Sequence, residues 1–191
     1  MKAQPPGPTH APWQVLQSRE IYAAAPWVRL SLQEVRLPDG RVVRDYHQIA
    51  LPEYSVVFAE TEDGRVLVER QYKHGIGEVT LMLPAGLIEP GEEPCRGAQR
   101  EMLEETGYTA DDWKPLGRFV PNSNYGCGRA HLFHARGARR VAEPNAGDLE
   151  EMEILLLTRD ELFRAVREGR VHATAVVAAI ALATHPVLGA V

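Results

Sequence analysis

The chain has 191 residues, and its 26 acidic side chains exceed its 21 lysines and arginines, which gives a formal net charge of −5 at pH 7. This acidic balance argues against a general nucleic-acid binder, which needs a basic surface to neutralise phosphates. Two cysteines, Cys95 and Cys127, do not indicate a disulfide framework in a chain of this length, which fits one domain with a substantial core.

The amino-terminal residues 1–14 are rich in proline and lack the charged and apolar regions of a signal peptide. We expect them to form a flexible arm ahead of a single domain that spans residues 15–191. The most apolar stretch, Ala173–Ala183, is too short to cross a bilayer. We therefore expect a cytoplasmic protein without a membrane partner.

Residues 27–71 show the alternation of strands separated by turns. The segment WVRLSLQEVRL runs into a Pro-Asp-Gly turn at 38–40, and a second turn at 62–64 separates YSVVFAE from RVLVERQY. The first hairpin could be an arm that reaches another subunit or a part of the main sheet. The sequence leaves both arrangements open.

Three carboxylates in residues 86–108 share one face of a predicted helix. Glu101 and Glu105 are four positions apart, and Glu101 and Glu104 are three apart. Carboxylates at this spacing repel one another, so the cluster needs a counter-charge. A hard divalent cation such as Mg²⁺ or Mn²⁺ prefers carboxylate oxygens, whereas the simpler alternative is a solvated acidic face.

This segment resembles the signature of the Nudix hydrolases, G-x5-E-x7-R-E-U-x-E-E-x-G-U, in which U is aliphatic. The seven fixed positions are filled by Gly86, Glu92, Arg100, Glu101, Glu104, Glu105 and Gly107. Met102 takes the first U, and Tyr108 stands at the last. The resemblance implies an α/β/α sandwich with a mixed sheet and an amino-terminal β-hairpin arm. It also implies hydrolysis of a nucleoside diphosphate linked to another group, with Mg²⁺ or Mn²⁺ as cofactor.

The same resemblance implies roles within the signature. The Ala85 carbonyl, Glu101 and Glu105 would coordinate metal, with Glu104 as a further ligand or as a support for one. Arg100 would orient these carboxylates by charge-assisted hydrogen bonds.

Three other residues of the signature have structural roles. Glu92 would brace the loop against the helix, while Gly86 and Gly107 allow backbone conformations that a Cβ would hinder.

The signature helix is expected over 93–105, with Pro94 in its first turn and Gly107 as its stop. Thr158 and Glu161 form a capping-box pattern for a later helix. The remaining predicted elements are strands at 116–120, 130–135 and 152–158, helices at 159–168 and 173–183, and a binding loop at 121–128.

The general base is expected outside the signature, because related pyrophosphatases carry it on an acidic loop before a late strand. Asp148, Glu150 and Glu151 occupy that place, and Glu150 is favoured by its position relative to the following strand. The alternative for each is an ordinary solvated side chain.

The wider pattern, from about residue 33 to 183, resembles the ADP-ribose pyrophosphatase branch. Lys73 and Met82 stand where that branch often carries arginine and glutamate. Lysine meets a phosphate as a point charge rather than as a bidentate fork. Arg70, Lys73 and Arg129 are the candidate phosphate contacts, with a solvated charge as the alternative for each.

The histidines at 131 and 134 have no zinc-ligand partners at a typical spacing, so we expect them to be core or edge residues. We also expect a homodimer, with the strands of residues 27–50 crossing between subunits, because the extra hairpin would otherwise expose a sheet edge.

The leading hypothesis is a metal-dependent hydrolase that cuts ADP-ribose or a related nucleoside diphosphate sugar into a nucleoside monophosphate and a sugar phosphate. An alternative is a housecleaning hydrolase of other nucleoside diphosphate derivatives, such as dinucleotides or oxidised nucleotides. A sensor that binds such a ligand without cleaving it is disfavoured by the intact carboxylate set.

Overall fold

The structure, a computed structural model, describes residues 11–145 and 151–188. Most of the predicted arm at 1–14 therefore lies outside the described residues. The chain divides into two compact units: one holds the residues up to Pro52 together with Asn122–Gly128, and the other holds the remainder.

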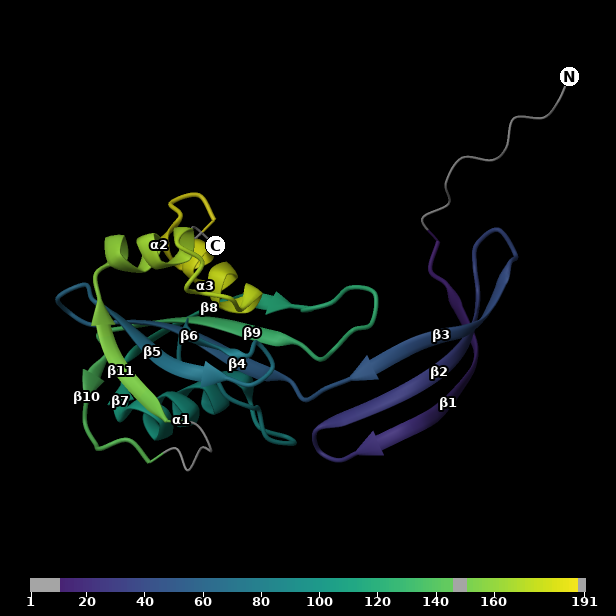
Figure 1. The fold of residues 1–191 in the computed structure, drawn as a ribbon, viewed down its shortest axis with the longest axis horizontal. Coiled ribbons are helices and arrows are strands. Elements are labelled where there is room, and N and C mark those ends of the chain that lie inside the picture. The colour runs from purple at the N-terminus through teal and green to yellow at the C-terminus, as the bar shows by residue number, and fades with distance from the viewer. Residues whose placement is uncertain (1–10, 146–150, 189–191) are drawn as a thin grey trace, which may run out of the picture. The chain divides into compact units, whose positions relative to one another are not determined.

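The first unit is a three-stranded antiparallel sheet in the order β1-β2-β3 (Figure 1). Its strands are β1 (Gln14–Ala24), β2 (Val28–Arg36) and β3 (Val42–Ala50). The β2–β3 connection contains the predicted Pro-Asp-Gly turn, in which Gly40 takes a φ of 88° and donates its N–H to the Leu37 carbonyl. Residues 122–128 of the loop predicted at 121–128 join this unit, since Ile49 donates its N–H to the Tyr125 carbonyl and its carbonyl accepts from the Cys127 N–H.

The second unit is built on a mixed six-stranded sheet with the order β11-β5-β4-β9-β8, and β6 pairs with β5. The β4–β9 pair is parallel, and the other pairs are antiparallel. The strands are β4 (Tyr54–Glu60), β5 (Val66–Lys73), β6 (Glu78–Met82), β8 (Asp112–Phe119), β9 (Ala130–Arg136) and β11 (Met152–Leu157). A separate short pair joins β7 (Tyr108–Thr109) to β10 (Arg139–Arg140).

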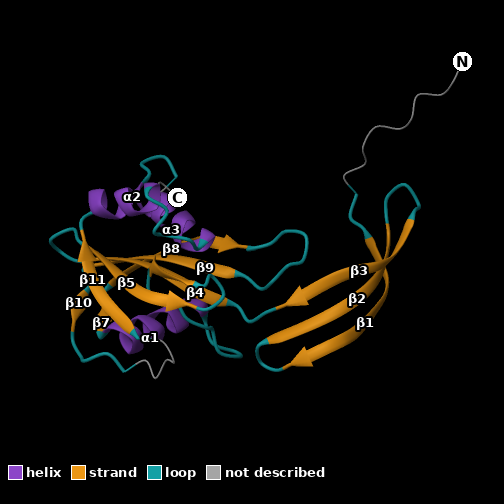
Figure 2. Ribbon diagram, in the orientation of Figure 1, coloured by secondary structure: helices purple, strands orange, loops and turns teal. Residues whose placement is uncertain are grey.

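Helices cover both faces of this sheet, as Figure 2 shows. α1 (Pro94–Thr106) packs on one face, and α2 (Arg159–Arg167) and α3 (Thr174–Thr184) lie on the other. Strand alternation separates the two cores: Val66 and Val68 pack with α2 and α3, while Leu67 packs with α1. The predicted α/β/α sandwich with a mixed sheet is confirmed.

The helix ends follow local sequence signals. The Thr158 side chain accepts from the Glu161 N–H, and the Glu161 side chain accepts from the Thr158 N–H, so the predicted capping box opens α2.

Within the described residues, no helix is both long and apolar enough to span a bilayer.

Candidate active site

The signature helix α1 begins and ends where its sequence dictates. The Glu93 carboxylate accepts from the N–H groups of Cys95 at 2.9 Å and Arg96 at 3.1 Å, which satisfies donors that the first helical turn leaves unpaired. Pro94 fits this first turn because its missing N–H is not needed there. Gly107, with a φ of 74°, ends the helix in the left-handed conformation. The three clustered carboxylates therefore fall in its last two turns.

The loop at 84–88 is fixed along β4 by backbone hydrogen bonds. These run from Val57 N to Pro84 O at 2.9 Å, from Ser55 N to Gly86 O at 2.9 Å and from Ile88 N to Glu53 O at 3.0 Å. The loop thus behaves as a short additional strand on one side of β4, with little freedom to shift.

Two helix carboxylates meet this loop at consecutive residues. A Cβ on Gly86 would overlap the Glu101 carboxylate, so only glycine leaves room for that side chain. The buried Glu105 accepts a hydrogen bond from the Ala85 N–H to its Oε2 at 3.0 Å. Glu101 and Glu105 therefore converge on the backbone of Ala85 and Gly86 from successive turns of α1.

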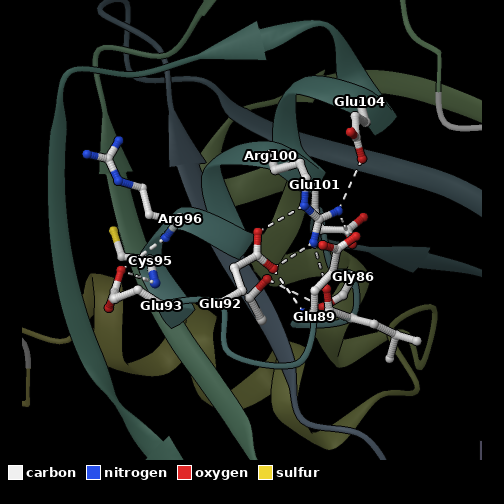
Figure 3. A network of polar contacts seen from close by, with 11 residues as sticks. Gly86, Glu89, Glu92, Glu93, Cys95, Arg96, Arg100, Glu101 and Glu104 are labelled. Carbon is white, nitrogen blue, oxygen red and sulfur yellow. Dashed lines mark hydrogen bonds and ion pairs between the residues drawn. The ribbon is translucent and has the colours of Figure 1, made fainter. Parts of the chain in front are cut away.

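One guanidinium holds three carboxylates in place (Figure 3). Arg100 binds Glu92 through two parallel bonds, Nε to Oε1 at 3.0 Å and Nη2 to Oε2 at 2.9 Å. Its Nη1 donates to Glu101 Oε1 at 2.8 Å and to Glu104 Oε2 at 3.2 Å, and its Nη2 also donates to the Leu87 carbonyl. These bonds raise the pKa of Arg100 and, in return, its guanidinium lowers the pKa of the Glu92 carboxyl.

The oxygen donors of this site fit a hard divalent cation. Glu101, Glu105 and the Ala85 carbonyl supply the carboxylate and carbonyl oxygens that Mg²⁺ and Mn²⁺ prefer, and both carboxylates lie against the backbone of Ala85 and Gly86. Across the part of the chain that the structure describes, no three acidic, His or Cys side chains come close enough to enclose an ion. Water and substrate phosphates normally complete the shell of Mg²⁺, so a partial protein set is compatible with such a site.

The predicted base residues fall at the edge of the described structure. Asp148 and Glu150 lie outside the described residues, and Glu151 is exposed immediately before β11. On the other side, Asn145 donates its N–H to the Glu104 carbonyl at 2.7 Å. The described chain therefore passes the carboxyl-terminal end of α1 shortly before this acidic segment.

The predicted phosphate contacts lie on different faces of the sheet. Arg70 follows the alternation of Val68 away from α1 and donates from Nε to Glu153 Oε2 at 2.6 Å. It is therefore not brought to the carboxylates of α1. Lys73, at the end of β5, follows Leu67 toward α1, and Arg129 directly precedes β9.

Sequence reasoning missed Glu53, which joins two residues far along the chain. Its carboxylate accepts from Arg129 Nη1 at 2.9 Å and lies 2.6 Å from His131 Nε2. The hydrogen bond with His131, followed by that with Arg129, lowers the pKa of the Glu53 carboxyl.

Sequence reasoning also missed Glu69, which is fully buried on β5 and accepts from the Gln71 side-chain amide at 3.0 Å. A carboxylate inside the apolar run RVLVERQY was the available signal, because charged side chains are rarely buried without partners.

Comparisons with known proteins agree with this geometry. The NUDIX domain matches residues 51–177, and the nucleoside diphosphate sugar hydrolase N-terminal domain matches residues 13–49. The two matches follow the division of the chain into two units near Pro52.

Individual proteins also resemble this chain. A methanol dehydrogenase activator from Bacillus methanolicus is 29% identical over 156 residues, which are 80% of this chain and 83% of that protein. An ADP-ribose pyrophosphatase from Bacillus subtilis (strain 168) is 27% identical over 146 residues, covering 76% and 78%. A crystal structure of an ADP compounds hydrolase superposes with a TM-score of 0.82 over 95% of this chain and 97% of that one. At 17% identity, this last likeness shows the fold alone.

Proposed function

Because the chain belongs to the Nudix family, whose domain spans residues 51–177, we propose that it hydrolyses the diphosphate of ADP-ribose or a related nucleoside diphosphate sugar. The products would be a nucleoside monophosphate and a sugar phosphate. The match of residues 13–49 to a domain of nucleoside diphosphate sugar hydrolases supports this substrate class, and so does the ADP-ribose pyrophosphatase among the relatives.

The observation that carries the proposal is the convergence of Glu101 and Glu105 on the backbone of Ala85 and Gly86, with Arg100 fixing the first of them. Nudix hydrolases generally need a divalent metal, and Ala85, Glu101, Glu105 and Glu104 are the proposed ligands. Bound there, Mg²⁺ or Mn²⁺ would neutralise phosphate charge and lower the pKa of a coordinated water.

The chain's own residues then have separate tasks. Arg100 keeps the carboxylates oriented, which costs no reorganisation during the reaction. A carboxylate of the acidic segment takes a proton from the attacking water, with Glu150 as first candidate and Asp148 or Glu151 as alternatives. The water oxygen bonds to phosphorus, the bridging P–O bond breaks, and the second phosphate leaves with its electron pair.

Basic residues would position the substrate. Lys73 is the proposed phosphate contact on β5, because strand alternation turns it toward α1. Arg129 is proposed as a further substrate contact from the start of β9. Arg70 has less support, since it follows the opposite face and binds Glu153.

We also propose that the protein is a homodimer. Large apolar side chains stand exposed in and around the first two strands of the first unit, with Trp13 at 51%, Tyr22 at 57% and Trp27 at 63% exposure. Burial of such side chains is the usual driving force for association. A cytoplasmic location stays a prediction that cell fractionation would test.

The proposed function is tested with purified protein, Mg²⁺ or Mn²⁺, and four substrates: ADP-ribose, ADP-glucose, a dinucleoside diphosphate and 8-oxo-dGTP. Chromatography should show AMP and a sugar phosphate formed in equal amounts from a nucleotide sugar. If the protein hydrolyses 8-oxo-dGTP or the dinucleoside diphosphate but neither nucleotide sugar, the housecleaning alternative is favoured instead. Glu105→Gln is the matched control, since it keeps the side-chain shape while removing a proposed ligand charge.

A further inference from the structure

Glu53, Arg129 and His131, here called the Glu53 cluster, lie together at one end of the central sheet. Glu53 directly precedes β4, and Arg129 directly precedes β9. These two strands are parallel, with Tyr54 opposite Ala130 and Ser55 opposite His131, so both begin at the same edge. Each oxygen of the Glu53 carboxylate has one partner: Arg129 Nη1 at 2.9 Å on Oε1, and His131 Nε2 at 2.6 Å on Oε2.

The cluster faces the same side of the sheet as α1. Val57 and Phe133 pack with α1, so Ser55 and His131, each two residues earlier on the same strands, point to that side. The loop at 84–88, here called the signature loop, runs along the other side of β4, where Ser55 donates its N–H to the Gly86 carbonyl. Gly86 is also the residue against which the Glu101 carboxylate lies.

Glu53 is bonded directly to the signature loop, since its carbonyl accepts from the Ile88 N–H at 3.0 Å, whereas Arg129 and His131 lie one strand further from that loop. Neighbouring strands are about 4.8 Å apart, so the backbones of Gly86 and His131 are about 10 Å apart across β4. A pentose joined to a phosphate spans such a distance. A diphosphate held beside Glu101 would thus bring one of its sugars over β4 to the cluster.

The chemistry of the cluster fits hydroxyl groups better than a phosphate. The charges of Arg129 and Glu53 offset each other, and a phosphate would meet the Glu53 carboxylate as a like charge. A carboxylate offers about four acceptor positions, of which Arg129 and His131 use two, so it can still accept from a hydroxyl. Both side chains remain accessible, with 49% of Arg129 and 38% of Glu53 exposed.

We propose that the Glu53 cluster binds the vicinal hydroxyl groups of a substrate sugar. This inference rests on the proposed function, because it needs a diphosphate held at the signature loop. Glu53 accepts from the hydroxyls, Arg129 donates to their oxygens, and His131 fixes the orientation of Glu53. The sugar is either the terminal sugar or the ribose of the nucleoside, since both carry the same vicinal diol.

Three substrates distinguish these sources: ADP-ribose, the β-methyl ester of ADP, which lacks the terminal sugar, and 2′-deoxy-ADP-ribose, which lacks the nucleoside diol. The tested variant is Glu53→Gln, and the control is Arg136→Lys, which changes an exposed ion pair with Asp112 at the opposite end of β9. Glu53→Gln should lower kcat/KM for ADP-ribose about tenfold or more, since a hydrogen bond to a charged group is lost. It should leave kcat/KM nearly unchanged for whichever analogue lacks the bound diol.

The outcomes separate this inference from the proposed function. Equal losses for all three substrates would show that the cluster only supports the fold near the site, and no loss for any would show that it touches no substrate. Either result overturns the inference while hydrolysis by the unmodified protein leaves the proposed function standing. If the unmodified protein hydrolyses none of the three with Mg²⁺ or Mn²⁺, both fall. Should Glu53→Gln fail to melt cooperatively, Arg129→Lys replaces it in the same comparison.

Discussion

Gly86→Ala is a direct probe of the contact between the signature loop and α1. The new Cβ would overlap the Glu101 carboxylate carbon far inside van der Waals contact, so one of the two must move. The loop is held by the 2.9 Å bond from Ser55 N to Gly86 O, and the carboxylate is held by the 2.8 Å bond from Arg100 Nη1. Either shift therefore breaks an existing interaction.

The size of the effect follows from these contacts. Overpacking of a fixed site typically costs about 1–3 kcal/mol. At about 2–4 °C per kcal/mol for a chain of this size, the melting temperature should fall by roughly 2–12 °C. Activity should fall more, by about 10–100-fold, because Glu101 is a proposed metal ligand and displaced ligands or their supports lower metal affinity and rate by such factors.

The assay measures kcat and the Mg²⁺ concentration for half-maximal rate, with thermal melting followed by circular dichroism. Gly75→Ala is the control, because Gly75 has no positive φ and nothing within 4 Å of an added Cβ. The control should behave like the unmodified protein. A normal rate and a normal Mg²⁺ requirement in Gly86→Ala would refute the placement of Glu101 at this loop.

Four further predictions test the site and the assembly. Glu105→Gln should lower the rate at least about a hundredfold while the protein stays folded, and a near-normal rate would remove Glu105 from the ligand set. Exhaustive chelation should abolish turnover of the nucleotide sugar, and full activity afterwards would contradict the mechanism. Glu150→Gln should lower turnover strongly with little change in substrate binding, while Asp148→Asn and Glu151→Gln each cost less; if all three are silent in steady-state assays, the base lies within the signature helix, with Glu104 as the first suspect. Sedimentation at micromolar concentration should show a dimer, and a monomer would refute the exchange of residues 27–50.

Local sequence signals were sufficient for the signature helix. A 3.6-residue period, a proline in the first turn and a glycine stop are short-range features, and α1 was predicted to within one residue at each end. The shared face of Glu101, Glu104 and Glu105 follows from the same period. Arg100 could be placed beside Glu104 for the same reason, because the two are four positions apart.

Long-range pairings could not be predicted in this way. Glu53 meets Arg129 and His131 across 76 and 78 positions, and only the parallel register of β4 and β9 brings them together. From the sequence alone, His131 was expected only to lie in the core or at a sheet edge.

The strand β1 was not predicted either. The sequence of Gln14–Ala24, QVLQSREIYAA, places its apolar residues side by side rather than in alternation with polar ones, and the strand is exposed almost throughout. The loop at 121–128 was expected to be a binding loop between the strands at 116–120 and 130–135; backbone bonds with Ile49 place its residues 122–128 in the first unit, and its binding role stays a prediction.

Arg100 also affects how readily the signature helix can fold. A helix that carries Glu101 and Glu104 within one turn would resist folding if only an ion from solution could offset their repulsion. The protein instead contains its own permanent cation, which already binds both side chains and clamps Glu92 to them. This internal countercharge reduces the repulsion that folding of the helix and loop must overcome, whether or not a divalent ion is present.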